Sequence, residues 1–100
     1  MIKHIVMFKL KENYEGKTAY ELAQEAKERA TGLSEINALK KIETGVNSPS
    51  ALQDNYEFVL VCDFENIDAL NEYQVHPIHK AFGEFIKEIR TGRACIDYEY

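Results

Sequence analysis

The sequence predicts an α+β fold with one four-stranded antiparallel sheet and helices packed against one of its faces. Three observations lead to this prediction. The 100 residues suffice for a single core, four segments carry the side-chain alternation of strands, and helical periodicity lies between the first two and between the last two of them. Right-handed crossovers turn this β-α-β-β-α-β order into a ferredoxin-like subunit with strand order 4-1-3-2. Residues 1–100 are expected to form one domain.

The first half of the chain supplies two strands and a helix. Segment 2–10, IKHIVMFKL, is rich in β-branched and aromatic residues and is apolar on both faces. A helix is predicted over 18–33, because apolar residues recur there at three- and four-residue spacing after a capping box formed by Thr18 and Glu21. Segment 38–46 is a more polar strand, whose lysines suit the edge of a sheet.

The second half repeats the pattern with more apolar residues. Segment 56–64, YEFVLVCDF, gives the strongest strand signal in the chain. A short helix is predicted over 67–73, and a further helix begins at Pro77 and ends at Gly92. Segment 93–100 alternates between the two faces as a last strand.

The predicted sheet has one face that the helices cannot cover. That face carries Ile5, Met7, Val59 and Val61 and is too apolar to remain exposed to water. A second copy of the sheet packed face to face would cover it and give an eight-stranded barrel. The expected partner is therefore another copy of the chain, in a homodimeric α/β barrel.

Composition and charge exclude several classes of protein. A formal net charge of −5 argues against binding to nucleic acid and to anionic membranes. No apolar run is long enough to span a bilayer, and the N-terminus lacks the features of a secretory signal, so a cytoplasmic location is expected. The two cysteines are not expected to form a disulfide. Cys62 and Cys95 are predicted to lie on strands separated by the first strand, which is too far apart for the bond.

Five segments of the chain together form a recognisable pattern: KHIVMFKLK, GVNSPS, YEFVLVCDF, ALNEYQVHPIHKAF and IDYEY. The most specific part is the HPIH phrase at 76–79 with Tyr73 just before it. With these segments the chain resembles the stress-responsive dimeric α/β-barrel (Dabb) family from end to end. The resemblance implies a dimer of ferredoxin-like subunits whose sheets form a shared barrel.

One branch of this family closes linear polyketides by intramolecular aldol condensation, in the manner of olivetolic acid cyclase. Similarity to that branch implies His79 as the general base and Tyr73 as its partner, in a pocket between the sheet and the helices. His4 matches a pocket histidine on the first strand. Phe58 stands where the third strand of that enzyme carries a further histidine, which implies a different substrate or no cyclase activity.

The residues themselves leave two readings for each candidate. Imidazole titrates near neutral pH, so His79 can act as a base or be a packed structural histidine. Tyr73 can orient that base and donate to an enolate oxygen, or anchor the core with its hydroxyl hydrogen-bonded. His4 can reach the same pocket or be a buried histidine that hydrogen-bonds to a backbone carbonyl. His76 precedes a proline, and capping the helix is its simpler role. Phe82 follows His79 by three residues and is expected beside it in the pocket.

Neither a metal nor a cofactor is expected. The spacing of His76 and His79 allows shared ligation, but two histidines without a third ligand are a weak signal. Asp97 and Glu99 lie on the face of the last strand opposite Ile96, either as a solvated edge or reaching across the barrel.

Three functions remain open on this reading, and the sequence does not decide whether the protein is an enzyme. The first is binding of a small hydrophobic or aromatic molecule, as in a stress or metabolic response. The second is a polyketide-cyclase-like lyase with His79 as base. The third is a structural assembly protein whose pocket is filled by side chains.

Overall fold

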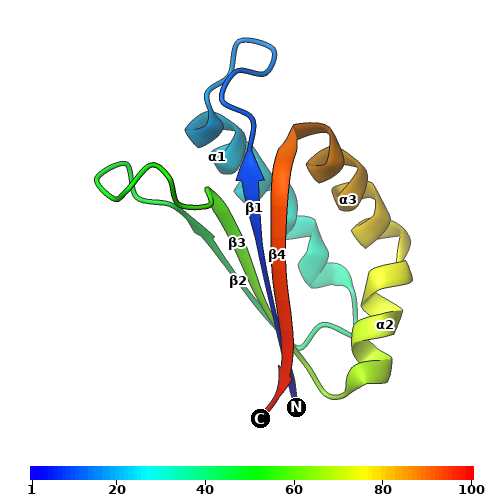
Figure 1. The fold of residues 1–100 in the computed structure, drawn as a ribbon. Helices are drawn as coiled ribbons and strands as arrows, with labels where there is room; N and C mark the ends of the chain where they lie inside the picture. Colours follow the sequence, from blue (N-terminus) through cyan, green and yellow to red (C-terminus); the bar gives the residue numbers. More distant parts are fainter.

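The computed structural model describes residues 1–100 and has a four-stranded antiparallel sheet with its helices on one face (Figure 1). The strand order β2-β3-β1-β4 is the one predicted. The strands are β1 (Ile2–Leu10), β2 (Lys41–Val46), β3 (Phe58–Phe64) and β4 (Arg90–Glu99). The helices are α1 (Ala19–Arg29), the 3-10 helix η1 (Ala30–Glu35), α2 (Ile67–Val75) and α3 (Pro77–Ile89).

The first helical region begins as predicted and ends differently. The Thr18 hydroxyl accepts a hydrogen bond from the backbone N–H of Glu21, and the Glu21 carboxylate accepts one from the backbone N–H of Thr18, which completes the capping box. The α-helix stops at Arg29, and the chain continues as the tighter helix η1. The apolar spacing that suggested one helix over 18–33 is preserved, because η1 still buries Ala30 and Leu33.

The last helix and strand meet earlier than predicted. Helix α3 ends at Ile89, and Arg90 is already extended with ψ of 149°. Gly92 lies inside β4 opposite Lys9 rather than at a helix end. A Cβ at position 92 would stand 3.3 Å from the Lys9 Cβ, so this glycine serves the close approach of two strands.

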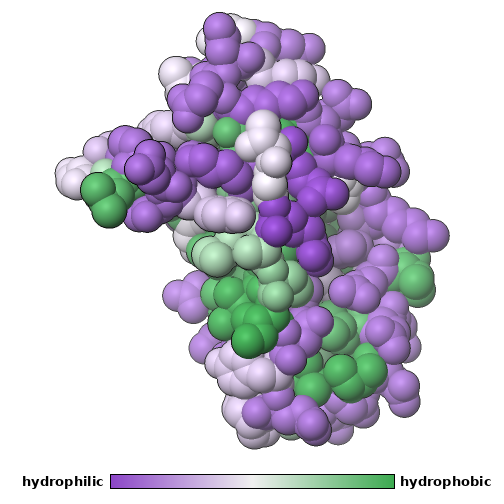
Figure 2. All heavy atoms as spheres, in the orientation of Figure 1, coloured by the Kyte–Doolittle hydropathy of each residue, from purple (hydrophilic) through white to green (hydrophobic).

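The two faces of the sheet differ as the alternation predicts. On β1, side chains at even positions point toward the helices and are buried. The opposite face keeps apolar side chains in contact with solvent, with exposed fractions of 37% for Met7 and 58% for Ile96. Figure 2 shows this apolar surface gathered over the strands in the middle of the molecule.

The two cysteines are free thiols. Cys62 is buried on β3, and Cys95 is exposed on β4. Strand β1 lies between those two strands, so the predicted separation holds. None of the helices combines the length and the apolar character that crossing a membrane requires.

Candidate functional site

A pocket of about 210 Å³ lies between the helix-facing side of the sheet and the helices α2 and α3. This is smaller than the roughly 300–1,000 Å³ of sites for drug-sized ligands. Its walls are mostly apolar, and three polar aromatic side chains reach it: His4 from β1, Tyr73 from α2 and His79 from α3. The apolar wall consists of Val6, Phe8, Leu60, Phe82 and Ile86.

Tyr73 has a phenol without a hydrogen bond of normal geometry. The residue is completely buried, and its hydroxyl has only the weakly polar thiol of Cys62 beside it. Its ring lies between Phe64 and His79, with ring centroids 4.9 and 4.6 Å away. Burial raises the pKa of this phenol, so the hydroxyl stays protonated and can donate.

His79 is the third residue of α3 and is half-buried at the pocket. Its Nδ1 lies 3.1 Å from the carbonyl oxygen of Gln74. A carbonyl only accepts, so Nδ1 carries the proton and Nε2 of the neutral ring has a free lone pair. Burial lowers the pKa of this imidazole below its usual value, which favours the neutral form. A side chain at Gly83, one turn along α3, would meet open space, so room remains in this part of the pocket.

His4 is held by a carboxylate. Its Nδ1 lies 2.5 Å from Oδ1 of Asp97, which faces it across the β1–β4 ladder. The two roles considered for Asp97, on a solvated edge or reaching across the barrel, are both replaced by this contact with His4. The backbone carbonyl considered from the sequence as the partner of His4 is replaced by this side chain. The contact between His4 and Asp97 follows only from the register of β1 and β4, which pairs positions 4 and 97.

Three cationic side chains at the pocket were not among the site residues predicted from the sequence. Lys87, Arg90 and Arg93 contribute to its lining, and none forms a salt bridge within the chain. No aspartate or glutamate lines the pocket. Because the chain as a whole carries a net charge of −5, this local excess of positive charge is a specific feature of the site.

The structure brings four of the six predicted site residues together. His4, Tyr73, His79 and Phe82 line the pocket. Phe58 lies outside the lining, because it is packed in the core with its ring 6.4 Å from Phe8 and 6.5 Å from Phe82. His76 also lies outside the lining. Its Nδ1 accepts a hydrogen bond of 3.1 Å from the backbone N–H of Ile78, so the side chain caps α3.

Comparison with known proteins gives a match over almost the whole chain. The family model described as the stress responsive A/B barrel domain matches residues 2–100. No curated protein matches the sequence.

Several solved structures are similar throughout. A dimeric protein of unknown function with a ferredoxin-like fold from Bacteroides fragilis is 34% identical, with a TM-score of 0.83 over 99% of this chain and 95% of its own. A Dabb family protein from Mesorhizobium loti is 26% identical, with a TM-score of 0.75 over 99% and 95%. A dimeric ferredoxin-like protein from Thermobifida fusca is 23% identical, with a TM-score of 0.82 over 99% and 90%.

Proposed function

Because the chain belongs to the stress-responsive A/B barrel domain family, we propose that it is a homodimer in which each subunit binds a small apolar or aromatic molecule. The observation that carries the binding proposal is Tyr73, a lining residue of the pocket whose buried hydroxyl has no hydrogen-bond partner of normal geometry, only the Cys62 thiol beside it. A buried polar group without a hydrogen bond costs about 1–3 kcal/mol. A ligand that accepts a hydrogen bond from Tyr73 would remove that cost.

The dimer rests on the uncovered face of the sheet. Two of the similar structures, from Bacteroides fragilis and Thermobifida fusca, are described as dimeric. In this chain, Ile96, Ile5 and Val61 form a continuous apolar row across β4, β1 and β3 on the solvent side. A second copy laid on this row would remove it from water, as the hydrophobic effect requires.

The lining of the pocket indicates that the ligand carries an acid group. Apolar walls suit a hydrocarbon or aromatic body, and Arg90 and Arg93 can bind a carboxylate in pairs of hydrogen bonds. Neither arginine forms a salt bridge within the chain, so both guanidinium groups can pair with an anionic ligand. The substrate class that fits is a small aromatic or aliphatic acid.

We expect 1-naphthoate to bind about tenfold or more tightly than 1-naphthamide, its neutral counterpart of similar shape. The reason is that a hydrogen bond to a charged group contributes about 1.5–3 kcal/mol, which the amide cannot recover. The measurement is isothermal titration of the whole protein with each compound. In Arg93→Gln the preference should shrink, whereas Arg29→Gln is the control, because Arg29 pairs with Glu25 on α1. Equal affinities for acid and amide would contradict the acid group, and failure of both to bind would favour the structural assembly role.

A second candidate function is a polyketide-cyclase-like lyase, which the hydrogen bond from His79 to Gln74 favours. With Nδ1 protonated and bonded to a carbonyl, Nε2 can remove a proton from a carbon beside a carbonyl group. The electron pair of that C–H bond moves into the carbonyl, and the resulting enolate oxygen could accept a hydrogen bond from Tyr73. Asp97 would stabilise His4 in one orientation as a polar contact for the substrate.

The pH dependence of such a reaction follows from the direction of the pKa shift. Burial lowers the pKa of His79, so the neutral base persists below the usual imidazole pKa of about 6.5. We expect kcat/KM for any converted substrate to fall on the acid side at a pH below that value, and we expect His79→Ala to abolish this limb. His76→Ala is the control, because that imidazole caps α3 away from the pocket. Full activity in His79→Ala would exclude His79 as the base.

A further inference from the structure

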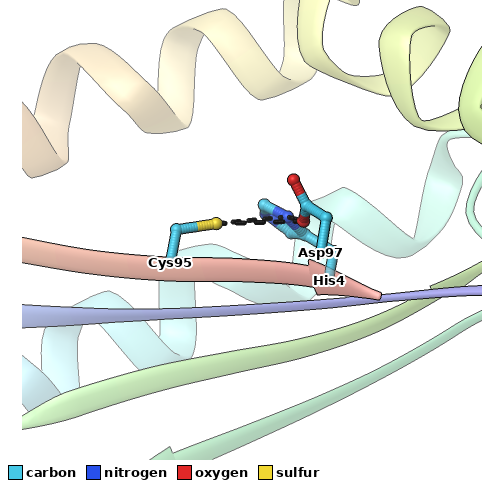
Figure 3. Close-up of side chains that lie close together, drawn as sticks. All are labelled: His4, Cys95 and Asp97. Carbon is cyan, nitrogen blue, oxygen red and sulfur yellow. Dashed lines mark hydrogen bonds and ion pairs between the residues drawn. The ribbon is translucent and has the colours of Figure 1, made fainter. Parts of the chain in front are cut away.

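Strands β1 and β4 place three different metal-binding side chains on the helix-facing side of the sheet. Cys95 and Asp97 are two residues apart on β4 and therefore share a face. His4 is the direct partner of Asp97 on β1. Figure 3 shows the imidazole, the thiol and the carboxylate standing together above these two strands, beneath the helices.

The donor atoms of the three side chains converge on one point. The Sγ of Cys95 lies 3.6 Å from Nδ1 of His4 and 3.8 Å from Oδ1 of Asp97. Ligand atoms bound to zinc at about 2.0–2.3 Å and at tetrahedral angles stand roughly 3.3–3.6 Å apart. The two distances to sulfur are therefore near those of a zinc site before any ion enters.

We propose that His4 Nδ1, Cys95 Sγ and Asp97 Oδ1 bind one zinc ion, with the fourth position left to water or a ligand. Nitrogen, sulfur and carboxylate oxygen are the three donor types that zinc accepts. Cys95 loses its proton on binding, so thiolate and carboxylate together balance the 2+ charge while His4 binds as the neutral ring. No other His, Cys, Asp or Glu residues in the chain bring three donor atoms within 4.8 Å of one another. The pair His76 and His79, whose spacing alone would allow shared ligation, is not such a group.

A nucleophilic cysteine does not explain this arrangement. In a Cys–His–Asp catalytic triad the thiol and the carboxylate contact different nitrogens of the imidazole, so that the ring can pass a proton. Here both Cys95 and Asp97 contact Nδ1 of His4. Three donors around a common centre fit metal binding better than proton transfer.

The cluster can open to admit an ion. Binding requires the 2.5 Å contact between His4 and Asp97 to widen to roughly 3.3 Å. The Asp97 side chain is 36% exposed and can rotate to make that change, whereas the His4 ring is nearly buried and stays fixed. Cys95 is also exposed, so the ion has a path from solvent.

The positive charge of Arg93 should weaken binding of the proposed zinc ion and strengthen binding of an acid. Removing that charge therefore tests the two proposals in opposite directions. Arg93 lies on the same face of β4, two residues before Cys95. Removing the charge should strengthen binding of a cation and weaken binding of an acid in the pocket. The metal proposal and the proposed ligand class therefore make opposite predictions for Arg93→Gln, and either can fail without the other.

The test is titration of the whole untagged protein with cobalt(II), whose visible spectrum reports tetrahedral geometry and whose near-ultraviolet charge-transfer band reports a thiolate ligand. We expect one ion per chain with both signals, and displacement by one equivalent of zinc. Cys95→Ser should abolish the charge-transfer band, and Asp97→Asn should weaken zinc binding by more than the roughly 10–100-fold that loss of an outer partner costs.

Matched controls separate the site from its surroundings. Cys62→Ser changes the other cysteine, and Glu99→Gln removes a carboxylate two residues further along β4. Both variants should bind cobalt as the unmodified protein does. Absence of the charge-transfer band in the unmodified protein, or its retention in Cys95→Ser, would overturn the proposal.

Discussion

Replacing Ile96 with lysine is expected to convert the proposed dimer into a monomer at micromolar concentration. Ile96 is 58% exposed in the single chain and lies on the apolar row with Ile5 and Val61. In a symmetric pair of sheets the substitution places two unpaired charges in the interface. An unpaired charge removed from water costs several kcal/mol, so dissociation should become at least about a thousandfold easier, since each 1.4 kcal/mol changes the equilibrium tenfold.

The measurement is light scattering or sedimentation over a range of protein concentrations. Leu52→Lys is the matched control, because Leu52 is an apolar side chain, 75% exposed, that lies away from the sheet in the loop between β2 and β3. That variant should remain dimeric. A monomeric unmodified protein, or an Ile96→Lys variant that associates as tightly as the control, would contradict the sheet-to-sheet dimer.

The fold could be predicted because its signals are local and repeat along the chain. Alternation on β1 and β3 assigns each side chain to a face without knowledge of the neighbouring strand, and Thr18 with Glu21 marks the start of α1. The order of elements then leaves few topologies. The errors lie at boundaries such as Arg29 and Gly92, where tertiary packing rather than local preference decides where a helix stops.

The candidate site could be predicted only in part, for a different reason. The resemblance to a family pointed to His79 and Tyr73, and the periodicity of β1 placed His4 on the face that meets the helices. The contact between His4 and Asp97 depends on the register of two strands 93 residues apart, which no local pattern encodes. The state of the Tyr73 hydroxyl could not be predicted either. Whether it has a hydrogen-bond partner depends on the positions of all the side chains around it.

Tyr73→Phe is expected to weaken ligand binding while leaving the protein as stable as before or more stable. The substitution keeps the ring that packs against Phe64 and His79 and removes only a hydroxyl with no hydrogen-bond partner of normal geometry. Removing an unsatisfied buried group relieves a cost of about 1–3 kcal/mol, so the free energy of unfolding should rise by an amount within that range at most. Affinity for 1-naphthoate should fall about tenfold, because the ligand loses a hydrogen bond made in a dry site.

The two readouts together distinguish a functional tyrosine from a structural one. Urea unfolding at one fixed protein concentration gives the stability, and titration gives the affinity. Tyr14→Phe is the control: its hydroxyl donates to Glu88 at 3.2 Å on the surface, so its loss should reduce stability slightly and leave binding unchanged. If Tyr73→Phe instead destabilises the protein by more than about 1 kcal/mol with unchanged affinity, the phenol belongs to the core. A gain in stability with a loss of affinity would mean that the unpaired hydroxyl is retained for the ligand at the expense of the fold.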